Sequence, residues 1–119
     1  MTAFRFEVRD NAFCKVDVAS GKMISCREPL GTKIVQVLVK GDGIILREDY
    51  YQFPAGRSNV YCLDQDLALK WAAELPMPTD VYANPVIDRG ETLECGSWQG
   101  FTCQLDPGSG KIVGSLFTK

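Results

Sequence analysis

The chain has 119 residues, of which 45% are hydrophobic and 24% charged, a composition typical of a folded globular domain rather than a disordered segment. Its 13 basic and 15 acidic residues give a net charge of -2 without a dense basic cluster, so we expect no nucleic-acid partner. The absence of histidine excludes the usual serine–histidine and cysteine–histidine nucleophiles.

Short apolar segments alternate with turns rich in Gly, Pro and Asp, which predicts antiparallel strands joined largely by hairpins. Residues 34–39 and 44–46, for example, flank a turn at 40–43. Segment 66–75 is ambiguous, because its helix formers and apolar spacing fit a helix whereas its place in a repeat favours a strand. We expect about eleven strands, at residues 3–8, 12–17, 22–27, 33–39, 43–48, 59–64, 68–75, 82–88, 91–97, 100–106 and 111–117.

A repeat recurs along the chain, at residues 13–22, 60–71 and 101–111. Each copy has a cysteine, an aliphatic residue followed by Asp, a short turn, a lysine and an apolar strand. The aspartates are Asp17, Asp64 and Asp106, and their spacing is typical of four-stranded blade units. Aspartate accepts hydrogen bonds from backbone N–H groups ahead of it, and Gly21 and Gly110 close the turn in the left-handed conformation. The repeat therefore predicts recurrent β-hairpins.

Residues 59–64, followed by Lys70 and Trp71, resemble the blade motif of pyrroloquinoline-quinone-type β-propeller repeats, and so do residues 105–111. The end of the chain, 96–119, resembles small bacterial proteins that carry the same hairpins. The resemblance implies an all-β fold, an antiparallel meander of about eleven strands in propeller-blade-like hairpin repeats.

The resemblance implies no activity and no cofactor. Quinone-dependent dehydrogenases of this type need a full ring of blades, a vicinal cysteine pair and a calcium site, and none of these is in the sequence. The middle repeat also departs from the motif, because Leu69 stands where glycine precedes the lysine.

The repeats amount to about two and a half blades in a single β-repeat domain over residues 1–119, and a ring needs at least four. Exposed edge strands must be covered, since unpaired edges promote association. The chain closes either as a small barrel or sandwich, or by oligomerisation, and we expect a homo-oligomer. The longest apolar run, 34–39, is too short to span a membrane, and the N-terminus lacks a signal-peptide pattern, so we expect a cytoplasmic protein without membrane contact.

Five cysteines, an odd number, and no secretion signal predict reduced thiols. None forms a C-x-x-C pair, so we expect no metal site. Cys14, Cys62 and Cys103 recur in the repeats and are expected to pack inside the hairpins. Cys95 falls opposite Cys103 if their turn has three residues with a bulge, and is offset by one if the turn has two.

No catalytic residue is predicted. The candidate contact residues are an aromatic at a hairpin tip, aromatics in the non-repetitive stretch 48–58, a cation beside that stretch, and a tyrosine after a Pro-rich connection. They are Trp98, Tyr50, Tyr51, Phe53, Arg47 and Tyr82. The expected function is a non-catalytic, self-associating module that binds a protein or a small molecule. The alternatives are a small-ligand-binding β-barrel and a His-free enzyme that uses carboxylate or thiol chemistry.

Overall fold

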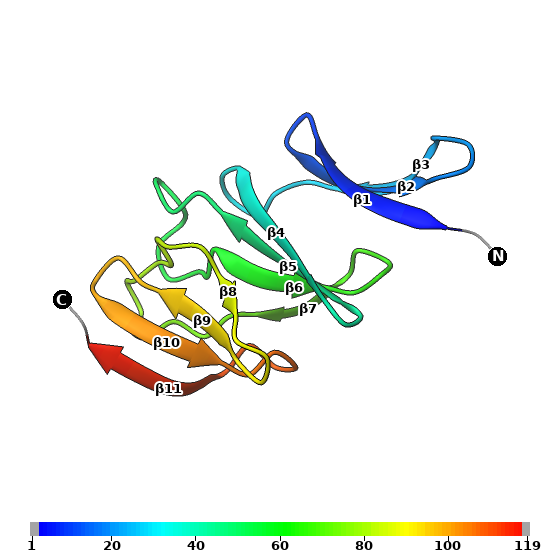
Figure 1. The fold of residues 1–119 in the computed structure, drawn as a ribbon. Helices are drawn as coiled ribbons and strands as arrows, with labels where there is room; N and C mark the ends of the chain where they lie inside the picture. The colour runs from blue at the N-terminus through cyan, green and yellow to red at the C-terminus, as the bar shows by residue number, and fades with distance from the viewer. Residues whose placement is uncertain (1–2, 118–119) are drawn as a thin grey trace.

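The computed structural model describes residues 3–117 and contains strands and turns, with no helix in that range. Its eleven strands form three separate antiparallel sheets that follow one another along the chain (Figure 1). The first sheet contains β1 (Phe4–Arg9), β2 (Ala12–Asp17) and β3 (Met23–Arg27). The second contains β4 (Ile34–Lys40), β5 (Gly43–Glu48), β6 (Val60–Leu63) and β7 (Leu69–Ala72). The third contains β8 (Ile87–Asp88), β9 (Leu93–Gly96), β10 (Phe101–Leu105) and β11 (Ile112–Phe117).

The predicted all-β class and the eleven-strand meander are confirmed, but the sheets formed by residues 3–117 are not closed. The helical alternative for residues 66–75 is wrong, because this segment contains β7. The strand predicted at 82–88 is shorter than expected, since β8 covers only its last two residues. Pro85 has no N–H for a sheet ladder, and the N–H groups of Ala83 and Asn84 donate instead to the Gly96 carbonyl.

The Asp-centred turns are built as the repeat predicted. In the third repeat the Asp106 N–H donates to the Lys111 carbonyl at 2.8 Å, and Gly110 adopts a φ of 73°. In the first repeat the Asp17 N–H donates to the Lys22 carbonyl at 2.9 Å. Each turn is therefore fixed by its aspartate and by a left-handed residue.

The middle turn is one residue shorter. The Asp64 N–H donates to the Ala68 carbonyl at 2.8 Å, and Leu67 takes the left-handed position with a φ of 66°. Leu67, rather than Leu69, therefore occupies the place of the glycine. Its side chain is buried against the core between the first two sheets, and this packing offsets the unfavourable backbone conformation.

The repeated cysteines are all buried, as predicted, but they do not occupy equivalent positions. Cys62 lies one residue nearer to its aspartate than Cys14 and Cys103 lie to theirs. Because successive side chains of a strand point to opposite faces, Cys62 packs towards the third sheet. Tyr61 stands in the position of the other two cysteines and packs towards the first sheet.

The second sheet is the centre of the molecule, because its two middle strands, β5 and β6, are buried on both faces. One cluster of apolar side chains lies between the first and second sheets: Phe13, Ile44, Leu46, Tyr61, Leu63 and Leu67. A larger cluster lies between the second and third sheets and includes Ile45, Val60, Cys62, Trp71, Tyr82, Leu93, Cys95, Cys103 and Leu105. Successive side chains of β5 and β6 therefore point alternately into one cluster and into the other, and these strands are apolar on both faces.

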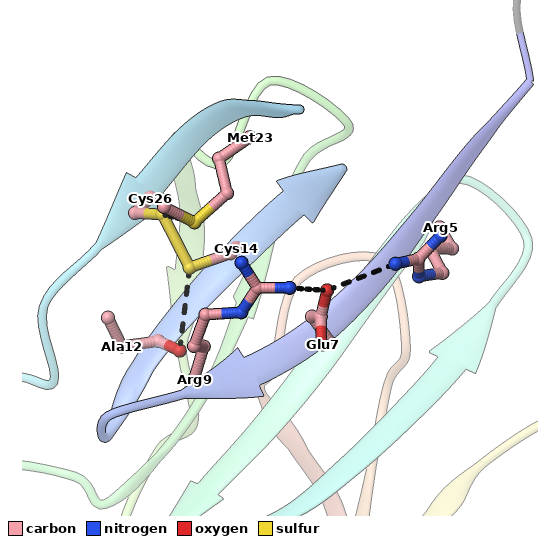
Figure 2. Close-up of a disulfide and its surroundings, with 7 residues drawn as sticks. All are labelled: Arg5, Glu7, Arg9, Ala12, Cys14, Met23 and Cys26. Carbon is pink, nitrogen blue, oxygen red and sulfur yellow. Dashed lines mark hydrogen bonds and ion pairs between the residues drawn. A yellow bond between two sulfur atoms is a disulfide. The ribbon is translucent and has the colours of Figure 1, made fainter. Parts of the chain in front are cut away.

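The prediction of five reduced thiols is wrong for two of them. Cys14 and Cys26 form a disulfide between β2 and β3, with their Cα atoms 4.1 Å apart (Figure 2). The two residues are direct partners in the register of the hairpin. Sequence reasoning missed this pairing because Cys26 lies outside the recurrent motif, and a register shift between Lys15 and Val16 sets its position.

Replacing Cys26 with serine is expected to lower the free energy of unfolding by about 2–3 kcal/mol, because the bond closes a short loop with a sequence separation of 12. Urea denaturation with and without a thiol reductant measures the effect. The reductant should destabilise the wild type by a similar amount and leave the Cys26→Ser variant unchanged. A wild type indifferent to reduction would contradict the prediction.

Candidate functional site

An aromatic groove lies between two loops that are distant in sequence. One is the connection from β5 to β6, and the other is the turn from β9 to β10, with the connection from β7 to β8 between them. The hollow has a volume of about 510 Å³. We define the aromatic groove by its lining residues: Tyr50, Tyr51, Gln52, Phe53, Ala55, Thr79, Val81 and Trp98.

Two aromatic rings from opposite sides of the groove meet. The Tyr50 and Trp98 rings stack with their centroids 5.3 Å apart. Trp98 is 59% exposed and Tyr51 is 69% exposed, whereas Phe53 is buried at the base of its loop. Large apolar side chains of this kind are usually covered in a folded protein, so their exposure around one hollow marks a candidate contact surface.

The loop that carries three of these aromatics is held in one conformation. The Asp49 carboxylate accepts the Tyr51 N–H at 3.0 Å, and the Phe53 N–H donates to the Tyr50 carbonyl at 3.2 Å. Phe53 packs so closely on Gly31 that a Cβ on that glycine would lie 2.9 Å from the Phe53 ring. A side chain at position 31 would therefore displace the base of the loop.

The other side of the groove is held through the backbone. The Trp98 N–H donates to the Val81 carbonyl at 2.8 Å. The Asp80 Oδ1 accepts the N–H groups of Val81, at 2.9 Å, and Gln99, at 3.1 Å. Asp80 is buried, and its second carboxylate oxygen has no hydrogen-bond partner among residues 3–117. The carboxylate thus ties the hairpin tip to the connection between the second and third sheets.

Four of the six predicted contact residues line the aromatic groove, and the other two lie elsewhere. Arg47 is half-buried on β5, where its Nε donates to the Gln36 Oε1 at 3.1 Å, and burial lowers the pKa of its guanidinium. Tyr82 is buried in the core, and its hydroxyl donates to the Glu74 carbonyl. Burial raises the pKa of this hydroxyl. Neither side chain is placed to contact a partner in the groove.

Sequence reasoning missed the residues that connect the two loops, Thr79 and Val81. They lie in a connection whose composition indicates only a link between repeats. They reach the groove because Val81 pairs with the backbone of Trp98, a contact between residues 17 positions apart (98 − 81). The only sequence signal is Asp80 between them, a residue type that accepts backbone hydrogen bonds in turns.

The thiols in the described structure have the properties of core side chains. Cys62, Cys95 and Cys103 form no disulfide and are buried. Burial raises the pKa of each, to about 12 for Cys95, which disfavours the reactive thiolate. Cys95 and Cys103 are direct partners between β9 and β10, as the three-residue turn predicted. Residues 3–117 contain no group of three potential metal ligands. They also contain no helix with the length and apolarity of a membrane span.

No family model matches the chain, and no curated protein matches it. Solved structures do. BamB from Moraxella catarrhalis is 20% identical with a TM-score of 0.60, and the match covers 97% of this chain and 33% of BamB. The computationally designed Ika8 protein is 9% identical with a TM-score of 0.67, and the match covers 99% of this chain and 34% of Ika8. The designed Ika4 protein is 9% identical with a TM-score of 0.68, with 99% of this chain and 68% of Ika4 covered.

These likenesses concern the fold alone. BamB and the designed proteins have β-propeller-type folds, and the likeness is consistent with propeller-like repeats in this chain. The chain spans about a third of the length of BamB and of Ika8. The propeller-like repeats predicted from the Asp-centred turns are thereby confirmed.

Proposed function

We propose that the chain is a non-catalytic binding module whose contact surface is the aromatic groove. The observation that carries this proposal is the exposure of Trp98 and Tyr51 on two loops that are each fixed by hydrogen bonds. Exposed aromatics on rigid loops lose little conformational entropy on binding, so they contribute strongly to affinity. The burial of the free thiols supports a role without thiol catalysis.

An extended protein segment with apolar side chains is the partner we favour. The groove is open along the surface and is lined mainly by aromatic rings, with amide and hydroxyl groups from Gln52 and Thr79 at its side. Such a surface offers stacking and apolar contact, together with a few hydrogen bonds that fix the orientation of a peptide. A small apolar ligand is the second candidate, although the three open sheets do not enclose it as a barrel would.

We infer a bacterial origin and kinship with the pyrroloquinoline-quinone-type repeats from the motifs of the second and third repeats. We also propose self-association, because each sheet formed by residues 3–117 ends in strands with one unpaired edge. We also propose a cytoplasmic location, as expected from the N-terminal sequence. The disulfide between Cys14 and Cys26 runs against this location, because such bonds are more common in oxidising compartments.

Replacing Trp98 with alanine is expected to weaken peptide binding strongly while leaving the fold intact, because Trp98 is exposed. The measurement is selection of a displayed random-peptide library on the wild-type protein, followed by titration of the selected peptides. We expect the dissociation constant to rise roughly tenfold to a hundredfold on loss of such an aromatic anchor.

The matched control is Val113→Ala, which removes an exposed apolar side chain on β11 outside the groove. This variant should bind the selected peptides as the wild type does. Peptides that bind wild type and Trp98→Ala equally would contradict the proposal. Thermal stabilisation by a metabolite panel, lost in Trp98→Ala, would instead favour the small-ligand alternative.

A further inference from the structure

Among residues 3–117, the first sheet has three strands, whereas each of the other two sheets has four. In the first sheet, the Asp-centred turn follows the middle strand of the set β1–β2–β3. The equivalent sets in the second and third sheets are β5–β6–β7 and β9–β10–β11, because there too the Asp-centred turn follows the middle strand. In the second and third sheets a further strand, β4 or β8, pairs with the first strand of this set. Within the described chain β1 pairs with β2 alone, so its other side is an open edge (Figure 1).

The backbone of β1 is directed so that this edge can pair. The Ala3 carbonyl accepts the Val18 N–H, so Ala3 points its backbone groups towards β2. In an antiparallel strand these groups alternate in direction from one residue to the next. The N–H and C=O groups of Phe4, Phe6 and Val8 are therefore directed towards the open side.

The side chains of β1 are divided between its two faces. Phe4 and Val8, each 42% exposed, share one face with Phe6, which stacks on Phe13. The other face carries a row of alternating charge, in which the Glu7 carboxylate lies 3.5 Å from Arg5 and 2.8 Å from Arg9 (Figure 2). The order of charges along β1 determines which strand can pair with its open edge, and in which register.

We propose that β1 pairs antiparallel with the β1 strand of a second copy, with Phe6 opposite the partner's Phe6 on the two-fold axis. In this register Phe4 lies opposite the partner's Val8, and Arg5 lies opposite the partner's Glu7. The edge-directed backbone groups then face one another and form about six hydrogen bonds between the copies. The inference deepens the self-association in the proposed function and does not involve the aromatic groove.

The charges select this register from its neighbours. A shift of two residues places Glu7 opposite the partner's Glu7 and Arg5 opposite the partner's Arg9, and like charges directly across a sheet are destabilising. A shift of one residue places the edge-directed N–H and C=O groups of one copy opposite residues of the other copy whose N–H and C=O groups are directed towards β2, so the two strands cannot form hydrogen bonds. The strand is thus complementary to a copy of itself, which is the requirement of an isologous interface.

The neighbouring sheet has an uncovered apolar face on the same side. Val37 and Val39 of β4 pair with Leu46 and Ile44, which face the first sheet, yet they are 40% and 56% exposed. On the opposite face of β4, Gln36 is covered by the segment leading into β8, where its side chain bonds both backbone groups of Val86.

On the side of the third sheet, the segment leading into β8 thus covers β4 at Gln36, whereas Val37 and Val39 on the opposite face are uncovered. The partner's β1 takes the corresponding place beside the first sheet, and it brings three further apolar side chains towards the exposed valines. An interface of this kind buries both the open backbone and the apolar surface next to it.

Charge reversal on β1 tests the register. Sedimentation equilibrium should find a wild-type dimer at micromolar concentration. Glu7→Arg should weaken the dimer roughly tenfold or more by opposing Arg5 with the partner's new arginine. The double variant Arg5→Glu, Glu7→Arg should restore wild-type association, since the opposed charges are again complementary. Glu91→Arg, which makes the same change of net charge at an exposed position outside β1, should leave the dimer unchanged.

A second variant tests the backbone pairing. Val8→Pro removes an N–H that is directed to the open edge, so it should abolish the dimer while the monomer keeps its circular dichroism spectrum. A wild type that remains monomeric at high micromolar concentration overturns the proposal, as does a double variant that stays as weak as Glu7→Arg. Trp98→Ala should dimerise normally, so failure of this inference and failure of the groove proposal are distinguishable.

Discussion

Replacing Glu48 with glutamine is expected to lower the free energy of unfolding by about 3 kcal/mol, because it removes a carboxylate oxygen from a saturated buried site. Glu48 is fully buried, and its Oε1 accepts the N–H groups of Gly31, at 2.9 Å, and Thr32, at 2.8 Å. Its Oε2 accepts the Leu30 N–H at 2.6 Å and the hydroxyl of Tyr61. A glutamine NH₂ group turned to either side opposes at least one backbone N–H, which is left unpaired.

Urea denaturation measures the change, and Glu91→Gln is the matched control. Glu91 is exposed, so its substitution should alter stability by no more than about 0.5 kcal/mol. An effect of Glu48→Gln as small as that of the control would contradict the role of the carboxylate as an anchor.

The same carboxylate links the connection between the first two sheets to the aromatic groove. It holds the N–H of Gly31, on which Phe53 packs, and the N–H of Thr32, whose hydroxyl donates to the Asp49 carbonyl at 2.6 Å. The loop that presents Tyr50 and Tyr51 therefore rests on a segment fixed by Glu48. The groove depends on a buried charge that lies outside its own lining.

Most of the fold follows from local patterns in the sequence, because hairpins are local structures. The Asp-centred turns and the alternating strands give the sheets without knowledge of distant contacts. The exceptions are places where a difference of one residue, in the length of a turn or in the distance of a residue from its aspartate, changes which residue fills a position or which face it points to. Leu67 takes the place of a turn glycine because the middle turn is one residue shorter than the others. Cys62 faces the third sheet because it lies one residue nearer to its aspartate than Cys14 and Cys103 lie to theirs.

The candidate site was less predictable than the fold. The aromatic residues of the stretch 48–58 and Trp98 at its hairpin tip each indicate a contact surface, but the sequence does not place the two together. Only the packing of the third sheet on the second brings Tyr50 and Trp98 together. Tyr82 shows the opposite error, because a tyrosine beside a Pro-rich connection has the same local signal whether it is exposed or, as here, buried in the core. Burial of a single aromatic depends on tertiary contacts that spacing does not encode.

Replacing Asn59 with alanine is expected to destabilise the fold by about 3 kcal/mol, because one buried amide satisfies three backbone groups. Its Nδ2 donates to the carbonyls of Glu48, at 2.9 Å, and Tyr82, at 2.8 Å, and its Oδ1 accepts the Tyr82 N–H at 2.9 Å. Alanine leaves all three groups without a partner in a site that is fully buried.

Asn59 is a direct polar link between β5 and the connection that enters the third sheet, so its loss should also weaken the packing of that sheet on the second. Hydrogen exchange should then show lower protection in β9 and β10 than in β2 and β3. The control is Asn84→Ala, which removes an exposed amide of the same connection and should leave both stability and exchange unchanged. Equal loss of protection in all three sheets would instead mean that the chain unfolds as one cooperative unit, with the amide acting on the whole molecule rather than on one interface.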